Sequence, residues 1–463
     1  MEGGSAAAGA MGTEPVGSGR ALARKLLALS LPMMAGSLIE TLYNLTDAFF
    51  LGKLGAAEIG APSVTFSILF FLIIFGTGLS NAGTTLMAQS RGMGDQGKMN
   101  HYLNQSASLL GLAAAVLVAA GLALSAPVLS LLGTPPETYG HALVYLRIVL
   151  LGVPFTFAYF LLQSGFVAIG DTMTPLRVHL AAVLLNVALD PLFIYGPGPF
   201  PAWGVAGAAV ATVLSQTVGA VLSLAILAKG RGGLRLSPAL AKPVGKSWKL
   251  LLGIGLPSSL GQAVSALGFT VLQGVVNRFG VAAIAAFGIG NRLNNMFDIP
   301  AHGIVAASTG MVGRAMGARD QAGADRIIRT SLILVLALEL PLMGLAFLFG
   351  GDLVRFFVDD PEAVRLGRVM FTVITPSLLM FGLYMALTGA FQGAGDTKVI
   401  MALSITRLWV IRVPLAYALA GLTDLGPMSI WIAMFVSNFT IAVAGWLYWR
   451  SGRWRKALDP GRI

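Results

Sequence analysis

Apolar segments about as long as a membrane is thick recur along this chain. Each can cross a hydrocarbon core of ~30 Å as an α-helix. Only 11% of the residues are charged, whereas about a quarter are charged in a typical soluble domain. No strand-like alternation occurs, so we expect an all-α integral membrane protein. We predict twelve transmembrane helices, near residues 31–51, 60–86, 107–132, 142–166, 177–196, 203–228, 250–276, 281–310, 330–357, 367–391, 399–420 and 427–449.

The sequence also repeats itself. Pro32 aligns with Pro257, a shift of 225 residues (257 − 32). The same shift matches Leu31 with Leu256, Gly55 with Gly280, Asp95-Gln96 with Asp320-Gln321, and Phe166, Gly170, Asp171 and Thr172 with Phe391, Gly395, Asp396 and Thr397. Two bundles of six helices should therefore share one orientation, related by a pseudo-two-fold axis along the membrane normal. A cleft between them would open alternately to each side.

This repeat divides the chain into five predicted parts. We expect an N-lobe at 21–228 and a C-lobe at 250–449, joined by a basic cytoplasmic linker at 229–249. Residues 1–20 are expected to form a disordered tail, with initiation at Met1 or Met11 left open, and residues 450–463 a basic cytoplasmic tail. The first apolar run contains Glu40 and Asp47, which argues against a cleaved signal peptide.

The net charge of +11 reflects topology. If both termini lie on one side, most of the Lys and Arg residues lie there too, and the linker alone carries six: Lys229, Arg231, Arg235, Lys242, Lys246 and Lys249. The positive-inside rule then places both termini in the cytoplasm and the protein in the inner or plasma membrane. We expect contact with membrane lipid but no nucleic-acid partner. The absence of cysteine excludes disulfides and thiolate metal sites.

The first predicted helix carries a polar stripe. Glu40, Asn44 and Asp47 are spaced by four and three residues, so they share one helix face, with Tyr43 beside them. A charge near the bilayer centre costs roughly 2.5–3.5 kcal/mol on insertion scales. The stripe must therefore face protein or water, as an ion or proton pathway or as an interhelical hydrogen-bond cluster.

Two further helices of the N-lobe add matching groups. Asn186 and Asp190 lie one turn apart, and Pro191 cannot donate to the carbonyl of Val187, which is thereby freed. Thr212 and Gln216 lie one turn apart on the next helix. If Asp47 and Asp190 approach, both cannot easily ionise, so one should hold a proton or a cation. The alternative is a proline kink with a local aspartate cap.

The repeat is asymmetric at these acids. Asp47 aligns with Leu272 and Asp190 with Leu415 (272 − 47 and 415 − 190), so we expect buried carboxylates in the N-lobe only. The C-lobe has its own polar residues, which form either an Arg–Asp structural pair or a substrate contact: Asn291, Arg292, Asn294, Asp298, His302, Arg407 and Arg412.

Sequence motifs typical of enzymes and ATP-driven pumps are incomplete or absent. Gly245-Lys246-Ser247 resembles the end of a phosphate-binding loop, but the required earlier glycine is Leu240, so ATP hydrolysis is not expected. No Gly-x-Ser-x-Gly or His-Glu-x-x-His pattern occurs. We expect a protein that is not an enzyme and needs no cofactor. A membrane-embedded enzyme or a channel is a weaker alternative.

The chain resembles the multidrug and toxic compound extrusion (MATE) transporters, most closely their prokaryotic DinF-like branch. The resemblance covers residues 25–450. It is most specific in Asn44-Leu-Thr-Asp47-Ala with the following Gly52-Lys-Leu-Gly-Ala-Ala-Glu-Ile, in Asn186-Val-Ala-Leu-Asp190-Pro-Leu-Phe-Ile-Tyr195, and in Gly204-Val-Ala-Gly-Ala-Ala-Val-Ala-Thr212.

The resemblance implies a V-shaped, twelve-helix monomer that exports cationic or amphiphilic drug-like molecules by H+ or Na+ antiport. It implies that Asp47, Asn186, Asp190 and Thr212 respond to the proton or hold Na+. Other branches use acids on the seventh and tenth helices; here the seventh offers Gln262 and Ser265, and the tenth none. A lipid-linked saccharide flippase of the same superfamily is the alternative that Arg292 and Arg412 keep open.

Overall fold

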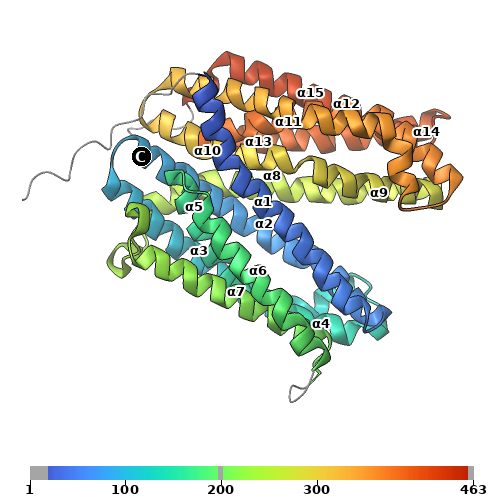
Figure 1. Cartoon of the computed structure of the whole chain (residues 1–463), viewed down its shortest axis with the longest axis horizontal. Coiled ribbons are helices and arrows are strands. Elements are labelled where there is room, and N and C mark those ends of the chain that lie inside the picture. Colours follow the sequence, from blue (N-terminus) through green and yellow to red (C-terminus); the bar gives the residue numbers. More distant parts are fainter. Residues whose placement is uncertain (1–18, 197–201, 457–463) are drawn as a thin grey trace, which may run out of the picture.

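The computed structural model describes residues 19–196 and 202–456, and all regular secondary structure in these two ranges is helical (Figure 1). The N-terminal helices are α1 (Gly19–Gly52), α2 (Ala56–Gly92), α3 (Gln96–Leu131), α4 (Pro136–Leu150), α5 (Val153–Ile169), α6 (Met173–Tyr195) and α7 (Val205–Ala228). The C-terminal helices are α8 (Gly245–Val276), α9 (Val281–Phe297), α10 (Ile299–Gly317), α11 (Gln321–Arg355), α12 (Pro361–Ala394), α13 (Thr397–Ile405), the π-helical η4 (Thr406–Arg412), α14 (Val413–Leu422) and α15 (Met428–Ser451). Short 3-10 turns complete them: η1 (Arg231–Gly233), η2 (Pro238–Ala241), η3 (Asn277–Phe279) and η5 (Arg453–Lys456).

The two predicted tails fall largely outside this description. Of the tail expected at 1–20 only the last two residues are described, and they belong to α1. The tail expected at 450–463 is described as far as residue 456.

The predicted membrane spans correspond to these helices. Ten helices of the described chain are long and apolar enough to cross a membrane, and α4 with α5, bent by 44°, makes an eleventh span. The remaining predicted span, 281–310, corresponds to α9 and α10, which meet at Asp298. Neither is a candidate span by itself, since α9 has only 17 residues and α10 includes the polar His302 and Arg314.

The repeated Gly-Asp-Thr stretch forms the expected helix-turn-helix. Gly170 ends α5 in the left-handed conformation (φ 86°), which glycine adopts without steric cost. Asp171 then accepts backbone N–H bonds from Met173 (3.1 Å) and Thr174 (3.0 Å) at the start of α6. In the second repeat Gly395 ends α12 with nearly the same φ of 84°.

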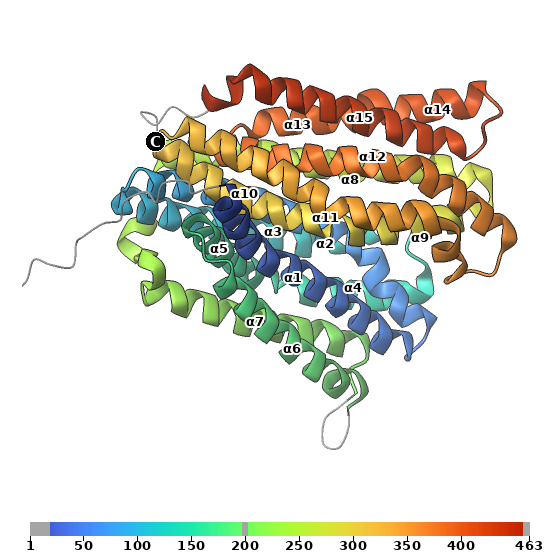
Figure 2. The same cartoon turned by 45° about the horizontal axis from the view of Figure 1, so that its top comes forward.

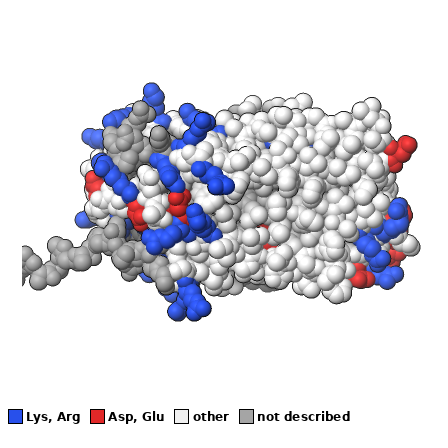
Figure 3. Space-filling view, turned by 90° about the horizontal axis from the view of Figure 1, so that it is seen from above, with Lys and Arg blue, Asp and Glu red and all other residues white. Residues whose placement is uncertain are grey.

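The two sets of helices form a V. In Figures 1 and 2, α1–α7 and α8–α15 converge near the described N-terminus and diverge toward the opposite end. Figure 3 shows Lys and Arg side chains gathered at the convergent end, with a smaller charged group at the other end and a largely uncharged surface between. This is the surface expected of a protein surrounded by hydrocarbon along its middle.

Helix α1 belongs to both arms of the V. Near its start, Leu22 and Leu26 are buried in a cluster with Ile304 and Met311 of α10. Farther along, α1 packs on α6 of the N-lobe. Figure 1 shows α1 crossing from one helix group to the other. A shift of α1 relative to either lobe therefore changes contacts in both.

Glycines allow the lobes to touch at the convergent end. A Cβ on Gly92 of α2 would lie 2.0 Å from the backbone oxygen of Arg314, and a Cβ on Gly317 of α10 would lie 2.0 Å from that of Gln89. Gly92 and Gly317 are equivalent in the repeat (317 − 92 = 225). The same close contact between α2 and α10 is thus made twice, once from each lobe. The two lobes are packed tightly against each other at the convergent end.

Candidate ion and substrate site

The four predicted coupling residues meet where α1, α6 and α7 pack together. The Asn186 side-chain amide donates to the Asp190 carboxylate (3.2 Å) and to the Thr212 hydroxyl (3.5 Å). The Tyr43 hydroxyl lies 3.2 Å from that of Thr212. The carboxyl groups of Asp47 and Asp190 lie within hydrogen-bonding reach of each other. These contacts join five side chains from three helices into one network.

Local sequence explains this convergence. Asn186 and Asp190 point the same way because they lie one helical turn apart. Helix α7 approaches α6 closely because Gly207 has no side chain: a Cβ there would lie 2.1 Å from the backbone oxygen of Phe193. This contact brings Thr212, farther along α7, to the level of Asn186. Asp190 is fully buried and Asn186 nearly so (2% exposed).

Several oxygen atoms of this region have no hydrogen-bond partner in the described structure. They are buried atoms, namely Oδ1 of Asp47, Oδ1 of Asn186, Oδ2 of Asp190 and Oε1 of Gln216. Buried polar atoms are normally satisfied, so orphaned acceptors need an explanation. Carboxylate, amide and hydroxyl oxygens suit a proton or a small hard cation such as Na+. The described chain has no group of three or more His, Cys, Asp or Glu residues placed to hold a metal ion, so a Na+ site here would use this mixed set.

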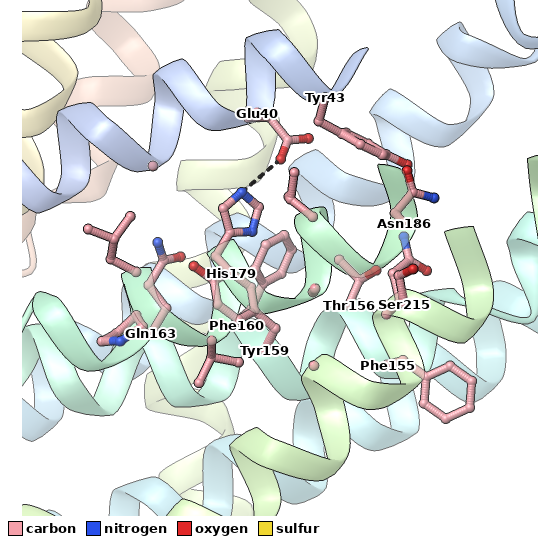
Figure 4. Close-up of a pocket in the computed structure, with 18 of the residues that line it drawn as sticks. Glu40, Tyr43, Phe155, Thr156, Tyr159, Phe160, Gln163, His179, Asn186 and Ser215 are labelled. Carbon is pink, nitrogen blue, oxygen red and sulfur yellow. Dashed lines mark ion pairs between the residues drawn. The ribbon is translucent and has the colours of Figure 1, made fainter. Parts of the chain in front are cut away.

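A pocket of about 530 Å³ adjoins the network, enclosed by α1, α2, α5, α6 and α7. Asn186 and Thr212 belong to both the pocket wall and the network. Figure 4 shows Glu40 of α1 paired with His179 of α6 across the pocket, at 3.2 Å. Tyr159 stacks on His179 with ring centres 5.5 Å apart.

The chemistry of this wall favours one class of ligand. Four aromatic residues from α1 and α5 line it: Tyr43, Phe155, Tyr159 and Phe160. Glu40 supplies a carboxylate with about half of its side chain exposed (52%). Aromatic faces and a carboxylate together suit a flat amphiphile or an organic cation, and the volume is that of a drug-sized site.

The predicted accessory residues do not all lie at this pocket. Glu40, Tyr43 and Gln216 line it. Asn44 is exposed and bonds to the backbone oxygen of Glu40 on its own helix (2.9 Å). The remaining four lie in the C-lobe and are not among the residues lining the pocket: Asn291, Asn294, Asp298 and Arg412.

Arg412 lies inside the C-lobe bundle. It is 1% exposed and donates to the Ser437 hydroxyl (2.8 Å) and to the Asn438 side-chain oxygen (2.5 Å). Asn438 in turn donates to the Ser377 hydroxyl at 2.9 Å. These bonds connect η4 to α15 and α12. They indicate that the buried guanidinium of Arg412 holds helices of the C-lobe together.

Sequence reasoning missed His179 and Tyr159. A signal was present for His179, which precedes Asn186 by seven residues and so lies on the same face of α6. The expectation of buried acids in the N-lobe only is wrong, because Glu339 of α11 in the C-lobe is fully buried. It was overlooked because a single acid within a long apolar run looks tolerable until the packing around it is known.

Comparisons with known proteins agree with this fold. The family model MatE matches twice, at residues 32–192 and 257–418, and the two matches start 225 residues apart (257 − 32). A probable multidrug resistance protein (YpnP) of Bacillus subtilis is 31% identical, with 93% of this chain and 96% of that protein covered. A probable multidrug resistance protein (NorM) of Thermotoga maritima is 27% identical, covering 94% of this chain and 93% of that protein.

A crystal structure described as MATE in the bent conformation superimposes on this one with a TM-score of 0.87 and 25% identity. The match covers 94% of this chain and 97% of that one. A duplicated, all-helical membrane fold, a family model that matches both repeats, and relatives that match over nearly their whole length give one conclusion. The chain belongs to the MatE family of multidrug and toxic compound extrusion transporters.

Proposed function

We propose that this protein exports amphiphilic or cationic drug-like compounds in exchange for H+ or Na+, with the coupling ion held by Asp47 and Asp190. The observation that carries the proposal is the shared wall between the ion network and the pocket. Asn186 and Thr212 bond within the network and also line the pocket. The names of the relatives, probable multidrug resistance proteins, support the substrate class.

Helix α1 contributes residues both to the site proposed for the ion and to the pocket proposed for the substrate. It contributes Asp47 to the ion network and Glu40 to the pocket, while Tyr43 between them touches Thr212 and lines the pocket. A proton or cation bound between Asp47 and Asp190 removes the repulsion between two carboxylates, which favours α1 lying close to α6. Release of the ion favours separation of the two helices, which reshapes the pocket wall.

Ion binding in the N-lobe also affects the C-lobe, because the first part of α1 packs on α10. A movement of its second half relative to α6 changes the angle at which its first half packs on Ile304 and Met311. Ion binding in the N-lobe is thereby linked to the angle between the lobes. Alternating access through such rocking is the usual mode of transporters built from two repeats.

The basic, convergent end faces the cytoplasm by the positive-inside rule, so this conformation is closed to the cytoplasm and outward-facing. Substrate bound from the cytoplasm or inner leaflet would leave from this state, and the ion would enter in its place. One charge crossing ~100 mV supplies about 2.3 kcal/mol. At ~1.4 kcal/mol per tenfold gradient, this sustains a gradient of about forty-fold for a neutral substrate. Exchange of one ion for one monovalent cationic substrate moves no net charge, so it is driven by the concentration gradient of the ion.

The flippase alternative has less support. Binding of a lipid-linked pyrophosphate calls for a cationic cavity. Arg412 is engaged with Ser437 and Asn438 inside the bundle, and the N-lobe pocket contains the acid Glu40 instead.

The decisive experiment is transport by the purified protein in proteoliposomes. Uptake of ethidium, a fluorescent organic cation, is followed while ΔpH or ΔNa+ is imposed separately. Transport driven by one gradient and lost in Asp47→Asn supports the proposal and identifies the ion. Transport that needs neither gradient, or that survives unchanged in Asp47→Asn, contradicts it.

A further inference from the structure

Glu339 is a buried acid for which the proposed export mechanism has no role. None of its side chain is exposed, and neither carboxyl oxygen has a hydrogen-bond partner within the described chain. The nearest charged residues on α11, Arg329 and Asp352, lie ten and thirteen positions away (339 − 329 and 352 − 339). An ionised carboxylate without partners is strongly unfavourable in a membrane bundle. The group therefore needs a positive partner or a proton.

Asp298 connects Glu339 to further polar groups of the C-lobe. Asp298, at the junction of α9 and α10, is near enough for its charge to act on Glu339, and its own Oδ1 atom is buried without a partner. Arg407 of η4 interacts electrostatically with Asp298 and with Tyr384 of α12. His302 lies one turn beyond Asp298 on α10, and its backbone N–H bonds to the Asp298 carbonyl (3.1 Å).

The charges of Glu339, Asp298 and Arg407 indicate how many protons this region needs. Arg407 is the one arginine that interacts with Asp298, and its guanidinium lies 4.4 Å from the centre of the Phe381 ring. Arginine stays protonated in proteins. Arg407 offsets the charge of Asp298, whereas Asp298 is the only charged group of the described chain that acts on Glu339. Arg412, which acts on Arg407, is bonded to Ser437 and Asn438. Neutrality at Glu339 therefore requires one proton.

The backbone of α12 passes close to the Glu339 carboxyl group at Gly382. A Cβ on Gly382 would lie 1.9 Å from Oε2 and 2.6 Å from the carboxyl carbon of Glu339. The equivalent position in the N-lobe is Phe157 (382 − 157 = 225). Glycine at 382 thus provides the space that lets the acid lie against α12.

The repeat relates this group to the N-lobe pocket. Asp298, Tyr384 and Arg407 are equivalent to Ile73, Tyr159 and Ala182 (each differing by 225), and all three of these line that pocket. The C-lobe therefore carries charged residues in the region where the N-lobe binds its ligand. Asp298 is half-buried and His302 is exposed, whereas Glu339 is fully buried.

We propose that Glu339 and Asp298 together hold one exchangeable proton, forming a second proton-binding site in the C-lobe, with Arg407 balancing the remaining charge. The site does not depend on the ion exchange proposed for the N-lobe, because proton binding is measured without transport. It uses α9–α12 and η4, whereas the N-lobe network uses α1, α6 and α7.

Infrared spectroscopy of the purified protein in detergent tests this directly. A protonated carboxyl group has a C=O stretch distinct from that of a carboxylate. At neutral pH we expect a protonated-carboxyl band that is lost in Glu339→Gln and retained in Glu362→Gln, which removes an exposed acid paired with Arg365. The band should shift on transfer to D2O and disappear at alkaline pH. Glu339→Met provides the same comparison if the glutamine variant does not fold.

Three results overturn the proposal. An unchanged band in both Glu339 variants means that this carboxyl group holds no proton. A Glu339 band insensitive to D2O and to alkali means that its proton is fixed and structural. Loss of the band on adding NaCl, but not choline chloride, assigns the site to a metal ion. Asp190→Asn is the control for the N-lobe and should leave the Glu339 band in place, whether or not the protein transports ethidium.

Discussion

Gln89 and Arg314 occupy equivalent positions in the two repeats, and each donates a hydrogen bond to the end of a helix in the other lobe. The Gln89 amide reaches the Gly393 carbonyl on α12 at 2.9 Å, and Arg314 reaches the Ala168 carbonyl on α5 at 2.7 Å. The acceptors are themselves equivalent (393 − 168 = 225). Both belong to the last turn of a helix, whose carbonyls lack intrahelical partners. The contact between the lobes at the convergent end thus includes a pair of matching bonds across the pseudo-two-fold axis.

Removing both bonds should open this end. In Gln89→Ala/Arg314→Ala, two hydrogen bonds worth about 1 kcal/mol each are lost only from the form in which this end is closed. About 2 kcal/mol corresponds to a shift of roughly thirty-fold in the conformational equilibrium. The chain has no native cysteine, so a single cysteine introduced at the buried Ala88 reports opening through its rate of labelling by a maleimide in inside-out vesicles.

The control for this prediction is Gln163→Ala, a glutamine that lines the pocket away from the interface between the lobes. It should leave the labelling rate of Ala88→Cys unchanged. Equal labelling in the double variant and in the parent would show that these bonds do not hold the end closed.

Gly92→Ala should block closure instead of loosening it. The added Cβ would meet the backbone of Arg314 at 2.0 Å, where no side chain can move aside. Overpacking typically costs 1–3 kcal/mol, and here it falls on the closed form alone. We expect export to fall at least tenfold with normal expression. Gly111→Ala, whose Cβ would meet nothing within 4 Å, is the matched control and should transport normally.

Asp47→Asn should abolish drug resistance in a host lacking its own pumps while expression stays intact. An amide keeps the shape of the side chain but cannot exchange a proton. If Asp47 and Asp190 share one ion as proposed, Asp190→Asn and the double variant should be as inactive as Asp47→Asn, a strongly non-additive result. Asp424→Asn, in an exposed loop, should retain resistance. Resistance at the normal level in Asp47→Asn would remove this residue from the mechanism.

Glu40→Gln should weaken the binding of cations more than that of neutral amphiphiles. The carboxylate is half-exposed within the pocket, so its attraction is screened and worth about 1 kcal/mol. We expect about five-fold weaker ethidium binding, measured by fluorescence anisotropy. Thr156→Ser, also on the pocket wall, is the control. An equal loss for a neutral ligand would indicate a change of pocket shape instead of charge recognition.

Arg412→Gln should destabilise the C-lobe without a specific effect on substrate affinity. Its guanidinium satisfies Ser437 and Asn438 in the bundle interior. Breaking a buried charged network typically costs 3–5 kcal/mol, which should lower the temperature of unfolding in detergent by several degrees. Arg292→Gln, on an exposed part of α9, should unfold normally. A stable Arg412→Gln protein with altered ethidium affinity would favour the substrate role left open by the sequence.

Much of the fold follows from the sequence alone. The membrane spans are set by apolar segment length, since each helix satisfies its own backbone in lipid. The repeat follows from matched Pro, Asp and Gly positions, and MatE matches the same two halves. The grouping of Asn186 with Asp190 follows from helical spacing, because a spacing of four residues fixes which side chains share a face.

Tertiary packing decided the rest. Helical period places Asp47 on a face of α1, but only the close contact of α6 and α7 at Gly207 shows what that face meets. Likewise Glu339 looks like an isolated acid in an apolar run until α12 presents Gly382 to it. The pairs Glu40–His179 and Gln89–Gly393 join residues far apart in the chain. Local periodicity carries no information about such contacts, because they depend on how whole helices fit together.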